Sequence, residues 1–377
     1  MLRFAFIFIV FVHGLIHLLG FAKEWNLMPL SQLSGKTLLP LNENLSKFFG
    51  TLWLLSFLAL VAAGLAFLWK KEWWTHLALI SIIISQLLIV LYWPDAKVGT
   101  IANVIILVAI ILSFTHRQFE RETKYEVQNL LADGTESERS VITMDMLETL
   151  PGPVQKWLKN AGVIGKNHIR QIYLEQNGKI RSKEGSAWLP VVARQFFTTE
   201  VPGFIWNVEG KQGSIFKVVG RDKYRHGKGH MLIKMFSMIP IVSEEGKEVN
   251  QGAMLRYLAE TVWFPTMALS QYISWEGIDA NSARATFIYR DLSVSGVFVF
   301  DDEGNVSAFK AQRYYYREKD EYSLESWSVS MSNYQQPAGI RIPMAGTVSW
   351  KLETGEFIYY QMEITDIEYD EPLSAVR

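Results

Sequence analysis

The stretch SGVFVFDDEGNVSAFKAQRYYY, residues 295–316, decides the fold class of the larger part of this chain. Two runs rich in apolar and aromatic residues, 297–300 and 306–315, flank a polar turn at residues 302–305 that contains one glycine. Two strand-like runs joined by a short glycine-containing turn predict an antiparallel hairpin. The run GVFVF is apolar on both strand faces, which indicates that both faces of the sheet are covered there.

Similar runs continue on both sides of this hairpin. GIRIPMAGTVSWKL (339–352) and GEFIYYQMEITDIEYD (355–370) follow it, and comparable segments begin near residue 169. About ten strands at short spacing predict one large antiparallel sheet, either a barrel or a half-barrel. Strands and helices do not alternate, and no G-x-G-x-x-G or Walker loop occurs, so the sequence lacks the signatures of the common nucleotide-binding folds.

One helix interrupts the predicted strands. EVNQGAMLRYLAETVWFP (248–265) has helical character over 248–261, and Pro265 ends it. Arg256 and Glu260 are four residues apart and therefore lie on one helix face. Two interpretations are open: Glu260 acts as a general base or Arg256 holds an anionic ligand head, or the two form a surface ion pair. The sequence favours the ion pair, because such pairs are common on helices.

A curved sheet with one helix over its concave side leaves space that side chains or a ligand must fill. We therefore predict a pocket for an apolar molecule, with an arginine at its mouth for a polar head. The alternative is a fully packed core. The predicted ligand-binding residues are Phe197, Trp206, Met235, Arg256, Glu260, Trp263, Phe298, Arg313 and Trp350.

The first 115 residues have a different character. They hold 7 of the 37 Lys and Arg residues and 4 of the 38 Asp and Glu residues. Apolar runs at 4–22, 48–69, 76–93 and 98–115 are each about long enough to span a bilayer. We predict a four-helix transmembrane module at 1–115, a charged linker at 116–145 and a soluble antiparallel β-domain at 146–377.

The distribution of basic residues predicts the orientation in a bacterial cell membrane. With the N-terminus inside, six Lys and Arg residues near the span ends are cytoplasmic and four lie on the other side. An excess of positive charge marks the cytoplasmic side. An even number of spans then places the C-terminal domain in the cytoplasm as well.

Two histidines lie within the first predicted span. His13 and His17 are one helical turn apart, so they cannot be the two opposing axial ligands of one haem. A metal or quinone site remains an alternative, but hydrogen bonds between packed helices are the favoured interpretation. We predict neither a metal nor a cofactor.

The composition excludes several classes of protein. The chain has no cysteine, which excludes disulfides, thiolate metal sites and iron–sulfur clusters. After residue 115 there are 30 basic and 34 acidic residues. This balance, without a basic stripe, does not indicate binding to nucleic acid.

Three sequence blocks resemble an uncharacterised family of bacterial domains over roughly residues 148–370. They are LPGPVQKWL (150–158), MLRYLAETVWFPTMAL (254–269) and GIRIPMAGTVSWKLETGEF (339–357), and the R-Y-L-A-E and W-F-P block is the most specific. The spans, with HGLIHLLGF (13–21) and YWPDAKVGTIANVIIL (92–107), resemble DoxX-like four-helix membrane modules. That resemblance implies quinone-linked oxidation in some relatives. The late hairpins are similar in style to the half-barrel of LolA-like lipoprotein carriers.

These observations favour a binding protein over an enzyme. The expected function is an integral membrane protein whose β-domain binds a lipid or other apolar ligand near the bilayer. The first alternative is a quinone-linked redox enzyme that uses the DoxX-like helices with His13 and His17. The second is a structural subunit of a membrane complex, and association with a second copy or a membrane partner is left open.

Overall fold

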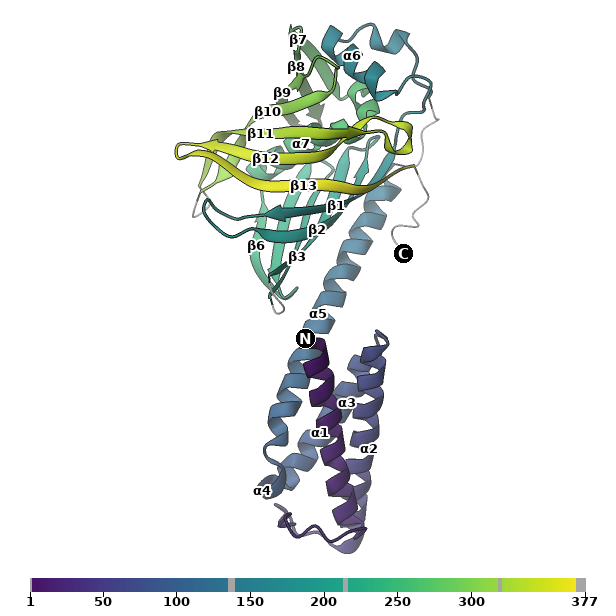
Figure 1. Ribbon diagram of the computed structural model, residues 1–377, viewed down its shortest axis with the longest axis vertical. Helices are drawn as coiled ribbons and strands as arrows, with labels where there is room; N and C mark the ends of the chain where they lie inside the picture. Colours follow the sequence, from purple (N-terminus) through teal and green to yellow (C-terminus); the bar gives the residue numbers. More distant parts are fainter. Residues whose placement is uncertain (1, 135–139, 213–215, 318–320, 371–377) are drawn as a thin grey trace. The chain divides into compact units, whose positions relative to one another are not determined.

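The computed structural model describes residues 2–134, 140–212, 216–317 and 321–370. The chain forms two compact units, Met1–Phe119 and Glu120–Arg377. The first unit is helical, and the second is built on one sheet (Figure 1).

The helical unit contains four helices that are long and apolar enough to cross a membrane. Their apolar windows have mean hydropathy values of 2.0 to 2.3. Large apolar side chains also point outward: Phe8, Leu87 and Val104 are all more than half exposed. An apolar exterior of this kind is compatible with membrane insertion. The helices are α1 (Leu2–Glu24), α2 (Glu43–Leu68), α3 (Trp74–Leu91), the short α4 (Trp93–Ala96) and α5 (Gly99–Ala132).

Helix α5 is longer than the sequence predicts. Residues 116–132, which the charge pattern places in a linker, continue the helix. They do so because Val127, Leu130 and Leu131 are buried against Phe196 and Ile205 of the sheet. Apolar contacts on one face thus stabilise a helix whose other face is charged. Residues 135–139 of the expected linker lie outside the described residues.

The second unit contains a 13-stranded sheet in which every pair of neighbouring strands is antiparallel. The order is β6-β5-β4-β3-β2-β1-β13-β12-β11-β10-β9-β8-β7. Consecutive strands are neighbours except for β6 and β7, which form the two edges of the sheet. The pairing of β1 with β13 joins the two meanders. The strands are β1 (Gln171–Ile180), β2 (Leu189–Thr198), β3 (Gly203–Gln212), β4 (Phe216–Arg225), β5 (Lys228–Met235), β6 (Ile239–Glu245), β7 (Ile273–Asp279), β8 (Ser282–Tyr289), β9 (Leu292–Phe300), β10 (Val306–Tyr316), β11 (Tyr322–Gln335), β12 (Ile342–Leu352) and β13 (Gly355–Tyr369).

The predicted hairpin is formed by β9 and β10. Asp301 closes its turn by accepting hydrogen bonds from the backbone N–H groups of Glu303 and Asn305. Two strands, β6 and β11, were not expected from the sequence. The segment SWSVSMS of β11 alternates polar and apolar residues, which is a strand signal that the sequence interpretation overlooked.

The sheet curves into a half-barrel around α7 (Lys247–Glu260), as Figure 1 shows. Helix α7 connects the edge strand β6 to the other edge strand, β7, and so crosses the concave side. The 3₁₀ turns η2 (Thr261–Trp263) and η3 (Pro265–Leu269) follow it, and α6 (Gly152–Ala161) covers part of β9 through Trp157 and Phe298. The fold class predicted from the sequence, four apolar helices and an antiparallel half-barrel, is confirmed.

Candidate functional site

Helix α7 is surrounded by the sheet rather than lying on its surface. Residues 252–260 are buried except for Arg256, which is partly buried. The helix packs against β4, β5 and β6 on one side and β9 and β10 on the other. The expected surface ion pair of Arg256 and Glu260 therefore lies inside the domain, with side chains only 14% and 11% exposed.

A cavity of about 520 Å³ lies between α7 and the sheet. This volume is within the range of about 300–1,000 Å³ usual for small-molecule sites. Gly252 and Ala259 contribute little side-chain volume on the helix side, and this leaves room that Trp206 and Trp350 only partly fill. Most of the lining is apolar. It includes Val191, Trp206, Met231, Ile233, Trp263, Trp327, Met331, Val348, Trp350 and Met362.

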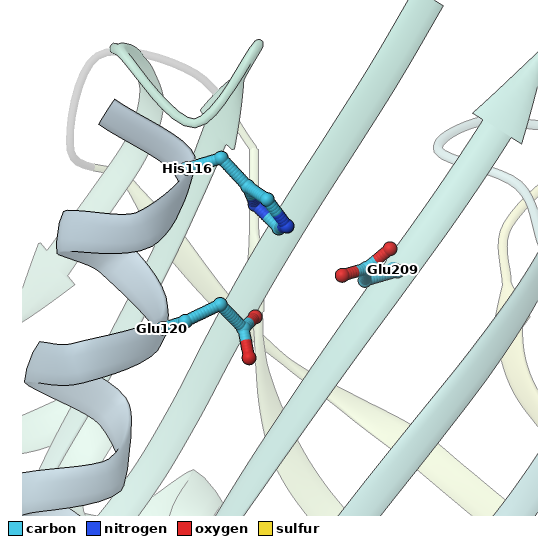
Figure 2. Close-up of side chains that lie close together, drawn as sticks. All are labelled: His116, Glu120 and Glu209. Atoms are coloured by element: carbon cyan, nitrogen blue, oxygen red, sulfur yellow. The ribbon is translucent and has the colours of Figure 1, made fainter. Parts of the chain in front are cut away.

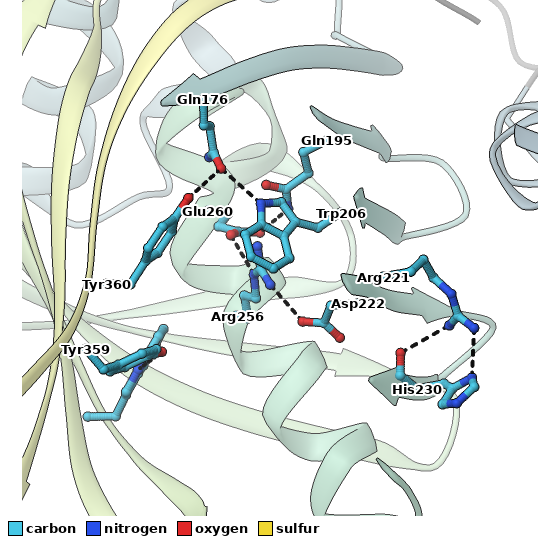
Figure 3. A network of polar contacts seen from close by, with 11 residues as sticks. Gln176, Gln195, Trp206, Arg221, Asp222, His230, Arg256, Glu260, Tyr359 and Tyr360 are labelled. Carbon is cyan, nitrogen blue, oxygen red and sulfur yellow. Dashed lines mark hydrogen bonds and ion pairs between the residues drawn. The ribbon is translucent and has the colours of Figure 1, made fainter. Parts of the chain in front are cut away.

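Arg256 lies at the centre of a buried polar cluster (Figure 3). Its Nε donates to Glu260 Oε1 at 2.7 Å, and its Nη1 donates to Asp222 Oδ2 at 2.7 Å. The guanidinium also lies 4.8 Å from the ring centre of Trp206. Burial opposes the charge of Arg256, but the carboxylates of Glu260 and Asp222 together raise its pKa. Arg256 is therefore paired with two carboxylates of the protein.

Glu260 is held by two donors. Gln195 Nε2 donates to Glu260 Oε2 at 2.8 Å, opposite the bond from Arg256. Burial raises the pKa of Glu260 above its ordinary value, although Arg256 and Gln195 act against this shift. Each carboxylate oxygen thus accepts one hydrogen bond, and Arg256 and Gln195 together hold Glu260 in place.

Gln176 fixes two of the aromatic rings beside the cluster. Its Oε1 accepts from Trp206 Nε1 and from the Tyr360 hydroxyl, both at 3.0 Å (Figure 3). Burial raises the pKa of Tyr360, which keeps this hydroxyl protonated and able to donate. The indole and phenol are thereby held in one orientation at the cavity wall.

Six of the nine predicted ligand-binding residues line this cavity: Trp206, Arg256, Glu260, Trp263, Arg313 and Trp350. The other three do not. Phe197 packs against Phe264, with ring centres 4.9 Å apart, because the turns after α7 fill that end of the half-barrel.

Phe298 and Met235 also lie outside the cavity. Phe298 is covered by Trp157 of α6, which stacks on it at 5.9 Å. Met235 ends β5, just after a register shift at Ile233 and Lys234 that interrupts the alternation of side chains. The expected roles of these residues in a pocket are therefore not supported by their positions.

The sequence interpretation missed Gln176, Gln195 and Asp222. A signal was present for the two glutamines, because strand alternation places Gln176 on the face of Leu174 and Gln195 on the face of Ala193. A polar residue on the inward face of a strand needs a partner.

Acidic residues also gather outside this cavity. His116 and Glu120 are one turn apart on α5, and the carboxylates of Glu120 and Glu209 approach within 4.8 Å (Figure 2). Glu209 forms an ion pair with Lys217 at 3.0 Å. The side chains are partly exposed, and we assign no ligand to them.

The sequence of the second unit matches one known family. Residues 148–369 match DUF6920, a family of unknown function. The chain belongs to this family. The DUF6920 match coincides with the region 148–370 whose sequence blocks resembled an uncharacterised family, and that part of the resemblance is confirmed.

Two solved structures are similar to the chain. An outer membrane lipoprotein-sorting protein domain from Vibrio parahaemolyticus is 9% identical, with a TM-score of 0.30, over 54% of this chain and 87% of that chain. A LolA superfamily protein from Nitrosomonas europaea is 11% identical, with a TM-score of 0.32, over 59% of this chain and 97% of that chain. No curated protein matches the chain.

Proposed function

We propose that this DUF6920 protein is an integral membrane protein whose β-domain binds a lipid or similar apolar molecule. The cavity between α7 and the sheet carries this proposal. Its volume, its aromatic and Met-rich lining and its few fixed polar groups are typical of a small-molecule site. The four apolar helices support a membrane anchor that keeps the domain near the bilayer.

The redox alternative has less support. A quinone site that uses His13 and His17 would need ring atoms free for the quinone. Instead, His13 Nε2 lies 2.8 Å from Asn103 Oδ1, and His17 Nε2 lies 2.9 Å from Ser85 Oγ. These bonds give both rings a packing role within the bundle, so we do not propose a catalytic one.

The binding proposal can be tested with a substitution that fills the cavity. Met331 lines it from β11, whereas the neighbouring Ser330 is exposed and outside the lining. The full chain in phosphatidylcholine nanodiscs would be titrated with the neutral dye N-phenyl-1-naphthylamine, with empty nanodiscs as the blank. We expect Met331→Trp to weaken dye binding by about tenfold, because the added volume competes with the dye.

Ser330→Trp is the matched control, since it introduces the same side chain on the opposite strand face and should leave dye binding unchanged. Equal dye binding by both variants, or no dye binding by the wild type, would contradict the proposal. Mass spectrometry of molecules that co-purify with the wild type and are lost from Met331→Trp would identify the ligand.

A further inference from the structure

Arg313 reaches the same cavity from β10. Its guanidinium lies 4.9 Å from the ring centre of Trp327 and 5.6 Å from that of Trp350. The facing residue of α7 is Gly252, where a Cβ atom would lie only 3.3 Å from Arg313 Nε. The absence of a side chain at Gly252 thus allows the Arg313 guanidinium to lie close to α7.

Arg313 has no anionic partner within the part of the chain that the structure describes. Its Nε is buried without a hydrogen-bond partner, and no carboxylate among those residues lies within 4.0 Å of it. Its cross-strand neighbour, Glu325, is bound to Arg317 at 2.5 Å. Two tryptophan rings stabilise a cation only in part. A partly buried guanidinium without hydrogen bonds is otherwise unfavourable.

The other two arginines at the cavity are already engaged. Arg256 binds Asp222 and Glu260, and Arg221 binds Glu126 at 2.9 Å. Of the arginines that line the cavity, Arg313 therefore has donors left for a ligand. The carboxylates of Glu244 and Glu248 also line the cavity, so a cationic head has a competing site there.

We propose that the ligand is an amphiphile with an anionic head, a carboxylate or a phosphate, and that Arg313 binds this head. The inference rests on the proposed function, since it assumes that the cavity binds an apolar molecule. The planar guanidinium presents paired donors that match the two oxygens of such a head. The apolar tail would then lie among Trp206, Met331 and Met362.

The test compares amphiphiles that carry different head groups on the same alkyl tail. Decanoate, decyl phosphate, 1-decanol and decylamine would each compete with N-phenyl-1-naphthylamine on the full chain in phosphatidylcholine nanodiscs. For the wild type, we expect the two anionic competitors to be roughly tenfold or more stronger than 1-decanol, the usual effect of a hydrogen bond to a charged group. The ratio of decanoate to decyl phosphate distinguishes a carboxylate ligand from a phosphate one.

Arg313→Met should remove this preference while the dye still binds, and Arg313→Lys should keep part of it. Arg284→Met is the matched control, because Arg284 is half exposed and pairs with Glu276 at the surface. Equal competition by all four amphiphiles, a preference for decylamine, or a preference that persists in Arg313→Met would overturn the inference. If one of these outcomes occurs and the wild type still binds the dye, only the inference about the head group is rejected. If the wild type does not bind the dye, the proposed function itself is rejected.

Discussion

Arg256 holds two carboxylates in a place from which water is largely excluded. Both ion pairs have N–O distances of 2.7 Å, and the side chains of Asp222 and Glu260 are 14% and 11% exposed. Such a cluster contributes little net stability when it is complete, because burial of the charges costs about as much as their attraction returns. Removal of the central cation, in contrast, leaves two buried charges without a partner.

Arg256→Met should therefore destabilise the β-domain by roughly 3–5 kcal/mol. This corresponds to a fall of roughly 6–20 °C in the melting temperature of a domain of this size. The measurement is thermal unfolding of the full chain, followed by intrinsic fluorescence.

Arg284→Met is again the control, because the exposed Arg284–Glu276 pair should contribute only about 0–1 kcal/mol. If the two variants melt at the same temperature, the cluster around Arg256 is not a buried network in solution.

Among the elements, α1 is joined to the other helices by polar bonds inside an apolar bundle. His17 Nδ1 donates to the backbone carbonyl of His13 at 2.7 Å, which leaves its Nε2 to accept from Ser85 of α3. Asn103 of α5 accepts from His13 and donates to Ser85 at 3.1 Å. The network thus links three helices and satisfies polar groups that would be costly in hydrocarbon.

Replacement of both histidines by asparagine should leave the helical unit folded. An asparagine can still hydrogen-bond between helices, and single interhelical hydrogen bonds in membranes contribute only about 0.6–1.7 kcal/mol. Circular dichroism of the purified His13→Asn, His17→Asn double variant should match the wild type.

Neither the wild type nor the His13→Asn, His17→Asn double variant should show haem absorbance in the visible region. A Soret band in the wild type that disappears in the double variant would show that the packing interpretation is wrong.

On the scale of the whole molecule, the chain joins an apolar helical unit to a half-barrel through α5, a single helix that contributes residues to both. The sheet is open, with β6 and β7 at its edges, and α7 connects these edges through the concave side. This connection borders the cavity, so the cavity depends on the whole strand order.

We predict that both chain termini are cytoplasmic, from the six-to-four distribution of Lys and Arg. An alkaline phosphatase fused after residue 377 should be inactive in bacterial cells, and a fluorescent protein fused there should be bright. A phosphatase fused after Lys36, between α1 and α2, should be active and serves as the control. The reverse pattern would place the β-domain outside the cytoplasm.

The sequence by itself determined the fold class and most of the helices and strands, with β6, β11 and the second half of α5 as exceptions. Apolar runs of membrane-spanning length predicted the four long helices, and the short apolar and aromatic runs around residues 295–316 predicted the antiparallel strands. The helix predicted at 248–261 is α7, at Lys247–Glu260. These features are local, because the spacing of apolar residues within one segment sets which of its faces is buried.

Tertiary structure alone decided which side chains meet. The pairing of β1 with β13 joins residues that are almost 200 positions apart, such as Ile172 and Tyr369. Arg256 and Glu260 have the four-residue spacing of an ion pair on a helix surface. Only the curved sheet around α7 buries this pair beside Asp222. The charged segment after residue 115 forms a helix that packs on two strands far along the chain, β2 and β3. Periodicity within a segment carries no information on such long-range contacts. The cavity depends on them, as does the position of Arg313, which has no carboxylate partner among the described residues.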